Sequence, residues 1–526
     1  MTPKALKSQT LLRVAIILVI LVLLNIVSIR VFSRLDFTRN GLFTLSDASK
    51  ELVGSLDDMV TVRAYFTEDL PAPYNNNRRA ILDELNEFKA YSKGNLQFEF
   101  IDPSGEKGER DAQQQGVSPV QVQVIKKDKF EVKRAYMGLV FLYEDKKEIL
   151  PVVQNTSTLE YDISSTIKRL TTRVRKKIGF ITGHGEPDLK EMTRAQQLLG
   201  KQYDITTVDV SKGKAVPSDI AVLIIMAPNA RFPETDKYQI DQYIMNGGRV
   251  AFLLNKVEAN LQQRFGRENN INLEDMLEAY GLRISPDLVR DAQCANISIM
   301  QQQFGFSIQS QVPFPLLPLV SNFNKNNMMV KDLESVVLFF ASSVDTVNLS
   351  TKNLEGEILM RSSKESGRQT NVFVFDPLRQ YSRADFTEQE IPLAAIVRGQ
   401  FKSAFADKPV PVDTSANLIA PSGNTITISP STRVVLVGDG DFPRDQYLGR
   451  GDNLTLFANM IDYLVDDVGL ITIRSKDVTL PPLEQVSDGA KKLIKYGNLV
   501  VPPVLILGYG LIRWRMRRTR KKALVL

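Results

Sequence analysis

The sequence predicts an α/β protein whose main domain is a doubly wound parallel sheet, flanked by two transmembrane helices. Apolar stretches lie near both ends of the chain, at residues 14–29 and 499–512. Between residues 178 and 254, short apolar runs alternate with helical segments of about ten residues, which is typical of a parallel sheet covered on both faces. Two apolar runs end in glycine-rich loops that contain ionisable side chains, so the strand ends are where a site is expected.

The chain has 526 residues, and 43% of them are hydrophobic. At about 100 to 200 residues per domain, this length predicts two or three domains with real cores. We expect residues 1–34 to form the cytoplasmic N-terminus and first transmembrane helix, 35–155 a first α/β domain, 156–480 the main domain with an insertion at about 256–431, 481–497 a stalk, 498–513 the second transmembrane helix, and 514–526 a basic cytoplasmic tail.

The apolar stretch from Val14 to Ile29 predicts a transmembrane helix. It extends to Leu11 and Phe32 with few interruptions, and about 20 apolar residues suffice to cross a bilayer. The alternative is a cleaved signal peptide, because basic residues precede the stretch. No small-x-small cleavage site follows before Arg30, so an uncleaved anchor is the better interpretation.

The apolar stretch at residues 499–512 predicts a second span. It is short and contains Pro502 and Pro503, but Tyr496 and Trp514 lie at its edges as interfacial aromatic residues, and a basic cluster follows. The alternative is an amphipathic or buried C-terminal helix. The stretch has no polar face, which favours the span.

The basic charge is concentrated at the two ends of the chain. The net charge is +6, and the ends carry ten basic residues and no acidic ones, so the part between them has a charge of −4. A nucleic-acid-binding protein would carry basic charge on its folded body, so nucleic acid is excluded as a partner. Basic ends beside apolar segments instead indicate two cytoplasmic termini in the bacterial inner membrane and a large periplasmic domain. The ten residues are Lys4, Lys7, Arg13, Arg513, Arg515, Arg517, Arg518, Arg520, Lys521 and Lys522.

The first domain shows a compact alternation of strands and helices. We predict strands at residues 60–66 and 96–101 around a helix at 77–92, then a short helix and a strand pair formed by 120–125 and 138–143. This β-α-β-α-β-β order resembles a thioredoxin-like domain. Without a Cys-x-x-Cys motif the resemblance implies a recognition or spacer module rather than a redox enzyme.

Cys294 is the only cysteine, which excludes an intrachain disulfide and any redox or zinc site built on a cysteine pair. A nucleophilic cysteine with His184 as its base is the remaining chemical alternative. No glycine-flanked elbow surrounds Cys294, since Asp-Ala-Gln precedes it and Ala-Asn-Ile follows it. A catalytic role for this cysteine is therefore not expected.

The main domain begins after a linking helix at residues 158–172. The α/β alternation loosens in the insertion, where we expect strands at 337–341 and 371–375 and a proline-rich loop at 313–318, and it resumes at 433. The predicted core strands are 178–182, 204–209, 220–226, 249–254 and 433–437, and the predicted core helices are 191–201, 233–246 and 453–464.

His184, the only histidine, lies between Gly183 and Gly185 directly after the strand at 178–182, and Glu186 follows it. Loops between a strand end and a helix start are where open α/β sheets bind ligands, and their amides suit an anion. There His184 would serve as a general base or metal ligand; the alternative is a structural imidazole bonded to the backbone or a carboxylate. One histidine and one cysteine are a poor supply of zinc ligands, so no metal is expected.

Asp439 and Asp441 follow the strand at 433–437 in the sequence Gly-Asp-Gly-Asp. Because the carboxyl ends of parallel strands meet at one edge of a sheet, we expect both aspartates in the same crevice as the histidine loop. Paired carboxylates suit magnesium, calcium or acid/base chemistry; the alternative is a turn in which they cap backbone amides. We predict a binding crevice with no catalytic residue and no cofactor, formed by Gly183, His184, Gly185, Glu186, Asp439 and Asp441.

Several ordered segments resemble the gliding-motility ABC transporter auxiliary family, GldG. They are the N-terminal anchor, the run at 35–46, Ile-Thr-Gly-His-Gly-Glu-Pro at 181–187, Val-Gly-Asp-Gly-Asp-Phe at 437–442, and the C-terminal span with its basic tail. The resemblance covers nearly the whole chain. It implies a non-catalytic, membrane-anchored accessory subunit that works in the lipid bilayer with a separate ABC permease and a separate ABC ATPase. The chain contains no Gly-x-x-x-x-Gly-Lys-Ser/Thr motif, so it is not itself a P-loop ATPase.

The resemblance also implies that the main domain is similar to class I glutamine amidotransferase and other flavodoxin-like domains. An amidotransferase nucleophile would follow a strand after the histidine loop, and residues 251–255 contain no cysteine there. Two alternatives stay open. One is an envelope hydrolase or transferase that uses His184, Glu186 and an aspartate of the second loop. The other is a periplasmic module that binds a sugar or a peptide, and the accessory subunit itself would also contact an envelope partner.

Overall fold

The computed structural model describes residues 44–68, 70, 74–126, 129–153, 156, 158–303, 306–412, 425–448, 451–465, 468–476, 495–498, 500, 503–504 and 506–515. The predicted first span lies outside these residues, as do most of the predicted stalk and basic tail. The chain divides into two units, Met1–Val478 and Thr479–Leu526, which are described separately.

The first part of the larger unit is a four-stranded sheet with helices. Its elements are α2 (Asp47–Gly54), β1 (Val60–Phe66), α3 (Tyr74–Tyr91), β2 (Leu96–Ile101), α4 (Gly105–Gln114), β3 (Val120–Lys126), β4 (Lys129–Ala135), β5 (Met137–Tyr143), β6 (Lys146–Leu150) and α5 (Leu159–Thr171). The sheet order is β2-β1-β5-β6. β1 is parallel to β2 and antiparallel to β5, and α3 provides the crossover that a parallel pair requires.

The predicted strand pair 120–125 with 138–143 is wrong. β3 pairs instead with β4 in a separate two-stranded sheet, with Val120 opposite Ala135, while β5 pairs with β1 and β6. β4 follows β3 after two residues, and strands joined so closely form a hairpin at a lower entropic cost than strands farther apart in sequence. The sequence reading missed β4 because its sequence, KFEVKRA, carries many charges.

The main part of the larger unit is built on an eight-stranded sheet. Its elements are β7 (Lys177–Thr182), η1 (Leu189–Met192), α6 (Thr193–Leu199), β8 (Asp204–Asp209), η2 (Ser211–Gly213), β9 (Ile220–Met226), α7 (Glu234–Met245), β10 (Arg249–Leu253), β11 (Val257–Asn260), β12 (Phe265–Glu268), α8 (Glu274–Ala279), β13 (Leu282–Ile284), β14 (Asp287–Asp291), β15 (Cys294–Gln303), β16 (Phe306–Val320), β17 (Asn322–Phe323), β18 (Val336–Val337), β19 (Val344–Thr346), α9 (Leu349–Lys352), β20 (Glu355–Arg361), β21 (Ser366–Thr370), β22 (Phe373–Val374), η3 (Arg383–Asp385), β23 (Pro392–Lys402), β24 (Ile428–Val437), α10 (Asn453–Val465) and α11 (Val468–Lys476). The predicted core strands are confirmed as β7, β8, β9, β10 and β24.

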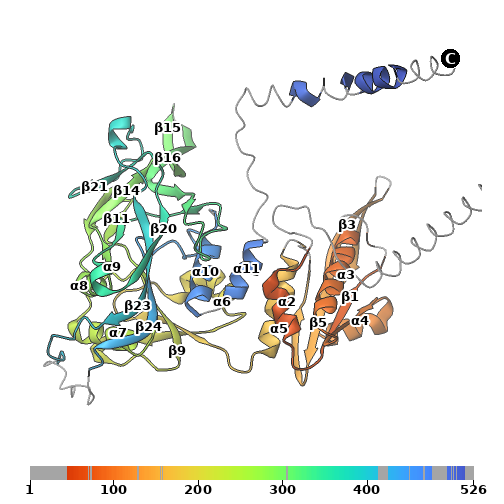
Figure 1. Cartoon of the computed structure of the whole chain (residues 1–526), viewed down its shortest axis with the longest axis horizontal. Helices are drawn as coiled ribbons and strands as arrows, with labels where there is room; N and C mark the ends of the chain where they lie inside the picture. The colour runs from red at the N-terminus through yellow and green to blue at the C-terminus, as the bar shows by residue number, and fades with distance from the viewer. Residues whose placement is uncertain are drawn as a thin grey trace, which may run out of the picture. The chain divides into compact units, whose positions relative to one another are not determined.

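The main sheet is mixed rather than wholly parallel. Its order is β17-β20-β23-β24-β10-β9-β7-β8, in which the strands from β24 to β8 are parallel and β23, β20 and β17 are added antiparallel (Figure 1). The antiparallel strands come from the range that was expected to be an insertion. The apolar residues Leu393 to Val397 of β23 are all buried, as in a strand that is covered on both of its faces. The expected insertion therefore contributes a strand to the core of the domain.

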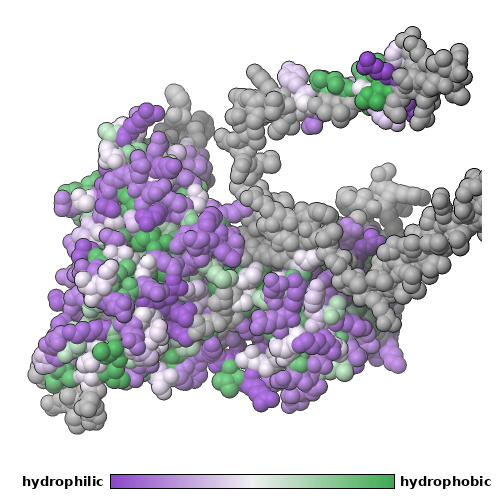
Figure 2. Space-filling model, viewed as in Figure 1, coloured by the Kyte–Doolittle hydropathy of each residue, from purple (hydrophilic) through white to green (hydrophobic). Residues whose placement is uncertain are grey.

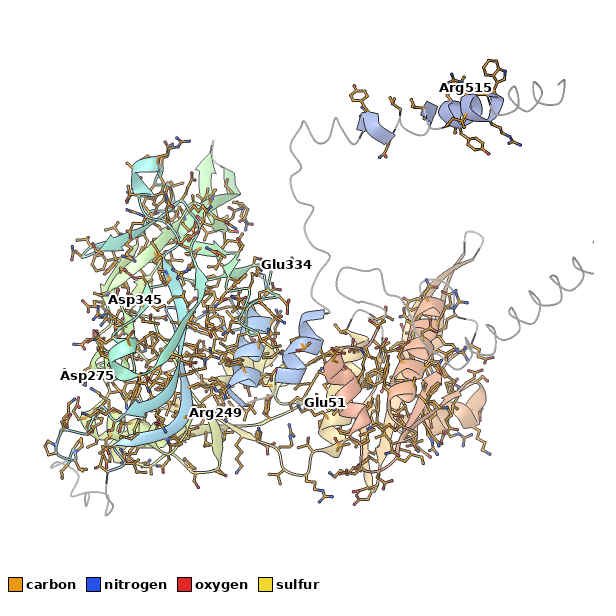
Figure 3. The ribbon with its side chains drawn as sticks, in the orientation of Figure 1. Glu51, Arg249, Asp275, Glu334, Asp345 and Arg515 are labelled. Carbon is orange, nitrogen blue, oxygen red and sulfur yellow. The ribbon has the colours of Figure 1, made fainter. Side chains whose placement is uncertain are left out.

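Helices cover both faces of the parallel strands, as the doubly wound pattern predicts. Neighbouring residues of one strand enter opposite cores: Ile224 packs with α6 and α10, whereas Leu223 packs with α7. The start of β10 is also held by a polar contact, because Arg249, which Figure 3 labels, donates from Nη1 to the carbonyl oxygen of Leu464 at 2.8 Å. The central strands β9 and β10 are therefore buried on both sides, and their ends are where a ligand would meet them.

The proline-rich segment 313–318 forms part of a strand, β16, and not the predicted loop. β16 pairs with β15 along most of its length. On its other side the carbonyl oxygens of Leu316 and Pro318 accept hydrogen bonds from the N–H groups of Phe340 and Leu338 at 3.1 and 3.0 Å. Because these bonds use proline carbonyls or their neighbours as acceptors, the missing proline N–H groups do not interrupt them. The predicted strands at 337–341 and 371–375 shorten to β18 and β22.

Three helices, α2, α5 and α11, form what we call the helix junction, where the first and last described segments of the larger unit meet (Figure 1). Glu160 of α5 is buried and accepts hydrogen bonds from the Ser46 N–H and the Ser49 hydroxyl, both at 2.7 Å. Ser49 also lies 2.9 Å from the hydroxyl of Ser164. The cap and first turn of α2 are thus bonded to α5.

The other side of the helix junction is centred on Arg474 of α11, which is 8% exposed. Its guanidinium lies 2.8 Å from the carboxylate of Asp462, donates to Asn459 at 2.8 Å and donates to the hydroxyl of Tyr161 at 3.0 Å. Asp462 also accepts from the hydroxyl of Tyr203 at 2.7 Å. This buried ion pair is accompanied by several additional hydrogen bonds, which help such a pair to be tolerated in a core. It bonds α11 to both α10 and α5.

The smaller unit contains only short helical stretches, at residues 495–498 and 506–515 among those described. Exposed hydrophobic side chains gather on the second stretch, beside basic ones (Figure 2). Among the described residues, no helix is both long enough and apolar enough to cross a bilayer.

Candidate functional site

A cleft lies outside the carboxyl ends of four parallel strands, β7, β9, β10 and β24. Its volume is about 480 Å³, and it is lined by residues that follow each of these strands, among them Gly185, Ala227, Asn255 and Asp441. β8 and β9 lie on opposite sides of β7, so the cleft is close to the point where the strand order reverses. Ligands of open α/β sheets bind at such points.

The loop after β7 needs glycines for its backbone conformation. Gly183 and Gly185 have φ angles of 112° and 77°, in the region that other residues rarely adopt. A Cβ atom on Gly185 would also lie only 1.7 Å from Oδ1 of Asn229. The carbonyl oxygen of His184 accepts hydrogen bonds from the N–H groups of Asn229 and Ala230 at 3.1 and 2.9 Å. The loop after β7 is therefore fixed to the loop after β9.

The side chain of His184 is buried inside this turn. Its ring stacks on that of Phe232 with the centroids 3.8 Å apart. Nε2 lies 2.9 Å from the carboxylate of Asp236, and Nδ1 lies 3.6 Å from the carboxylate of Glu186, which also accepts from the His184 backbone N–H at 2.7 Å. Burial by itself would lower the pKa of His184, but the hydrogen bonds and charges of Asp236 and Glu186 outweigh it and raise the pKa to about 9.

A charged His184 between two carboxylates supports the structural alternative for this residue. A general base works best when its pKa is near the operating pH, and an imidazole with a pKa of about 9 stays protonated at neutral pH. The other oxygen of Asp236 accepts from the N–H of Gly213 at 2.8 Å. The histidine group therefore connects the end of β7, the start of α7 and the segment after β8.

The loop after β24 needs glycines because the backbone packs closely there. A Cβ atom on Gly438 would lie 1.9 Å from the carbonyl oxygen of Ser342, and one on Gly440 would lie 2.6 Å from the carbonyl oxygen of Leu253. The carbonyl oxygen of Gly438 in turn accepts from the Ser342 N–H at 2.7 Å. This loop is thus held between the end of β10 and the segment that contains Ser342.

Asp439 is fully buried in this second loop. Its two carboxylate oxygens accept hydrogen bonds from the backbone N–H groups of Phe339 and Asp441, each at 2.7 Å. Burial and the nearby charge of Asp441 raise the pKa of Asp439 well above its ordinary value, although the backbone N–H groups act in the opposite direction. These contacts support the alternative in which this aspartate caps a turn.

Asp441 lines the cleft and takes part in a polar network. It accepts from Nη1 of Arg444 at 2.6 Å and from the side-chain amide of Asn255 at 2.8 Å. The carbonyl oxygen of the Asn255 side chain accepts from the N–H of Gly440 at 2.7 Å. The other terminal nitrogen of Arg444 donates to Glu191. The network therefore joins the loops after β10 and β24 to the helix η1.

The six residues predicted to form one crevice are divided by the structure. Gly185, Glu186 and Asp441 line the cleft, whereas Asp439 is buried and is not part of its lining. The prediction that the two loops meet at one edge of the sheet agrees with this geometry. That the edge binds a ligand remains a prediction.

Gly183 and His184 line a second hollow, with a volume of about 550 Å³. Ser211 and Thr235 also line it, and the loop after β7 separates it from the cleft. The single predicted crevice is thus two hollows that share one loop. Among the described ranges, no cluster of three or more histidine, cysteine or acidic residues is arranged to hold a metal ion.

The sequence reading missed several residues that line the cleft. Asn255 follows β10 by two positions, so the rule that sites lie at strand ends would have found it. Arg444 lies three residues after Asp441, a spacing typical of an ion pair within one turn. Phe339 and Tyr447, whose rings are 4.1 Å apart, come from segments that carry no strand-end signal. Only the three-dimensional fold brings these two rings to the cleft.

Comparison with known proteins assigns most of the chain to described families. Residues 175–467, more than half of the chain, match a family described as an ABC-type uncharacterized transport system. Residues 39–142 match a domain of unknown function, DUF7088. A protein of Borreliella burgdorferi (strain ATCC 35210 / DSM 4680 / CIP 102532 / B31), titled "Uncharacterized protein", is 23% identical over 522 residues, covering 95% of this chain and 96% of the relative.

Among solved structures, the mmIFT52 N-terminal domain aligns with a TM-score of 0.34 and 13% identity, over 55% of this chain and 97% of that one. PurLQS from Thermotoga maritima aligns with a TM-score of 0.27 and 7% identity, over 55% of this chain and 100% of that one. These scores are too low to assign a shared fold. The family match is therefore the finding that identifies the protein: the chain belongs to the auxiliary family of the ABC-type uncharacterized transport system, and this membership suggests a non-catalytic role in association with an ABC transporter.

Proposed function

We propose that the chain is a membrane-anchored accessory subunit that couples a periplasmic body to the permease of an ABC complex, in gliding motility or envelope export. Family membership supports the accessory role. The apolar segments at 14–29 and 499–512 and the basic ends support anchoring in the inner membrane with both termini cytoplasmic. In this proposal the ATPase is a separate chain, since this sequence has no P-loop, and so is the permease, since two apolar segments cannot enclose a transport pathway.

The helix junction is the observation that carries the proposal. The segment that follows the first apolar stretch, α2, and the segment that precedes the second, α11, both pack on α5. Along the chain, α5 connects the four-stranded sheet to the eight-stranded sheet. The same helix therefore contacts α2 and α11 and links the two sheets. A displacement of α2 or α11 would be transmitted to α5 through buried hydrogen bonds.

We also assign a thioredoxin-like module to residues 35–155 and a flavodoxin-like module to residues 156–480. The parallel β1-α3-β2 unit, followed by α4 and the antiparallel β5-β6 pair, supports the first assignment. The five parallel strands covered by helices on both faces support the second. The hydrolase alternative has less support, because His184 and Asp439 are engaged in buried structural contacts.

Affinity purification tests the proposed association. The tagged full-length chain is extracted from host membranes in mild detergent, and the proteins recovered with it are identified by mass spectrometry. An ATP-binding subunit and a multi-span permease are expected in the eluate. Their absence, from a preparation in which the chain itself remains folded, would overturn the proposal.

A designed cross-link tests the helix junction in the membrane. A Cβ atom on Gly469 would lie 3.4 Å from that of Ala48, close to the separation that a disulfide requires. The double variant Ala48→Cys/Gly469→Cys is therefore expected to cross-link under mild oxidation, with a changed mobility on a non-reducing gel. The matched control carries Ala48→Cys alone, with the native Cys294 as its only other thiol. Equal mobility shifts in both variants would contradict the arrangement of α2 and α11.

A further inference from the structure

We propose that the cleft outside the ends of β7, β9, β10 and β24 binds a protonated amine or guanidinium group carried on an apolar stem. The cleft is large enough for such a ligand, because small-molecule sites usually have volumes of about 300 to 1,000 Å³ and this one has about 480 Å³. It lies at the strand ends and is distinct from the helix junction. The inference therefore stands independently of the anchoring and the partners proposed above.

The charge of the cleft favours a cation. Five carboxylates and one cation, Arg444, belong to its lining. Two further cations outside the lining, His184 and Arg267, pair with lining carboxylates, which still leaves an excess of two negative charges among the described groups. The five carboxylates are those of Glu186, Asp188, Glu191, Glu258 and Asp441.

One of these carboxylates, that of Glu186, has an oxygen atom that can accept a further hydrogen bond. The side chain of Glu186 is only 2% exposed, and its Oε2 accepts from the backbone N–H of His184. Its Oε1 is buried and has no hydrogen-bond partner among the described residues. The Nδ1 atom of His184, 3.6 Å away, is likewise buried without one, and the distance is too long for a hydrogen bond between the two. A buried acceptor without a hydrogen bond is uncommon in proteins, and a ligand N–H would satisfy it.

The apolar wall of the cleft suits the same ligand. Phe339, Phe340 and Tyr447 line one side, and Leu261, which is 43% exposed, lies among the lining residues. Aromatic rings attract cations through their faces, and the effect grows when the cation is removed from water. The rings and Leu261 would also cover the methylene stem of an amine.

An anionic ligand is disfavoured because Arg444, the cation among the described lining residues, already pairs with carboxylates. Each terminal nitrogen of Arg444 already donates to a carboxylate, one to Asp441 at 2.6 Å and the other to Glu191, and only the buried Nε has no hydrogen-bond partner among the described residues. An anion would have to displace these carboxylates and would face the remaining negative charge. The side-chain amide of Asn255 donates one of its two N–H bonds to Asp441, and its oxygen accepts from the Gly440 N–H.

Calorimetric titration of the full-length chain in detergent tests the inference. The probes are putrescine, N-acetyl-lysine methylamide, a hexapeptide with one central lysine, methyl glucoside as a neutral probe and acetate as an anionic one. Saturable binding of the amine probes is expected, and it should weaken when sodium chloride is raised, because salt screens the attraction. Putrescine and the peptide must compete for one site. Tighter binding of the peptide would identify a protein side chain as the source, and tighter binding of putrescine a free amine.

The substitution Asp188→Asn removes one lining charge with little structural risk. Asp188 caps η1 by accepting from the N–H of Lys190 at 2.9 Å, and asparagine caps helices equally well. The affinity for amines is expected to fall about tenfold, because hydrogen bonds to charged groups contribute more than neutral ones. Tyr447→Leu keeps apolar bulk and is expected to weaken amine binding severalfold by removing a ring face. The matched control is Asp219→Asn, which removes an exposed charge at the amino end of the same sheet, where Asp219 pairs with Lys177.

The outcomes are distinct. No amine binding at millimolar concentration overturns the inference, as does equal affinity for amines and methyl glucoside, or an equal loss in the Asp188→Asn and Asp219→Asn variants. Co-purification of the ATPase and permease with Asp188→Asn should be unchanged. Failure of the proposed association would therefore show in the pull-down, and failure of the cleft inference only in the titration.

Discussion

The loops after β7 and β24 share a sequence pattern, Gly-His-Gly-Glu in the first and Gly-Asp-Gly-Asp in the second. The two loops require their glycines for different physical reasons. In both, the second residue is buried and the fourth lines the cleft. In the first loop the glycines are required by φ angles of 112° and 77°. In the second they are required because a Cβ atom would meet backbone oxygens at 1.9 and 2.6 Å.

The buried residues of the two loops also differ in the groups that bind their polar atoms. His184 is held by side chains, the carboxylates of Asp236 and Glu186. Asp439 is held by the backbone N–H groups of Phe339 and Asp441. One short pattern can therefore mark a site edge while its central residue is structural. The chemistry offered to a ligand resides in the fourth residue of each loop.

Removal of the histidine should produce the largest effect on this comparison. His184→Ala leaves two buried carboxylates without their cation, and breaking a buried pair in this way costs about 3 to 5 kcal/mol. The free energy of unfolding is measured by urea denaturation of the full chain, followed by circular dichroism. The double variant His184→Ala/Glu186→Ala serves as the control, because it removes one of the stranded charges and should recover part of the loss. An additive result would show that the two residues do not interact.

The two loops should also respond differently to pH. The pKa of His184 is raised from 6.5 to about 9 in the folded chain, so its contribution to stability is fully present below pH 6.5 and is lost as the pH rises through about 9. The loss is expected to be at most about 3 kcal/mol. Urea denaturation at a series of pH values measures it. A stability that does not fall between pH 6.5 and 9, or a fall that persists unchanged in His184→Ala, would contradict the assignment.

Alanine substitutions distinguish the two causes of the glycine requirement, which are close backbone packing at Gly438 and a positive φ angle at Gly183. Gly438→Ala places a Cβ atom 1.9 Å from a backbone oxygen, so the backbone must move, and we expect a loss of about 2 to 3 kcal/mol. Gly183→Ala meets nothing closer than 3.3 Å and should cost only about 1 to 2 kcal/mol, from its positive φ angle. Thermal unfolding of both variants under one condition gives the comparison. The reverse order of losses would mean that backbone conformation outweighs close packing.

The smallest expected effect is that of Asp439→Asn. Asparagine keeps one acceptor oxygen and loses the second, so one of the two backbone N–H groups is left without a partner, at a cost of about 1 to 2 kcal/mol. The raised pKa of Asp439 means that the native residue loses stability as the pH rises from its ordinary value of 3.8, and the variant should lack this dependence. Denaturation between pH 4 and 6 checks both points. A variant that retains the native slope would show that another group titrates there.

The sequence was sufficient for the core strands and for the edge of the sheet at which the cleft lies, because these depend on local patterns. β9 was predicted as residues 220–226 and is Ile220–Met226, since a continuous apolar run bounded by polar residues is typical of a buried parallel strand. The glycine loops lie at the same edge of the sheet as the cleft. The sequence pattern could not predict that the His184 side chain lies outside the cleft, because this depends on how Phe232 and Asp236 pack around the ring.

The errors lie where the pairing partner of a segment cannot be recognised from the segment's own sequence. The charged β4 takes β3 as its partner through a short connection, which the alternation of residues 120–125 alone does not reveal. The segment 313–318 reads as a loop because of its prolines, and it is a strand because its carbonyl oxygens, not its N–H groups, face residues 338 and 340. β23 was missed because its place beside β24 is set by pairing across the sheet.

The position of β24 has a consequence for how the chain is made. β24 lies between β23 and β10 in the sheet, yet β10 ends at Leu253 and β24 begins at Ile428. During synthesis the parallel half of the sheet must therefore wait, with one edge unpaired, until its neighbour has been translated. The cleft is completed only after that event, because Asp441, Arg444 and Tyr447 follow β24. A truncated chain that ends before β24 would expose an open sheet edge to aggregation and would have no cleft, so any ligand that binds there recognises only the finished domain.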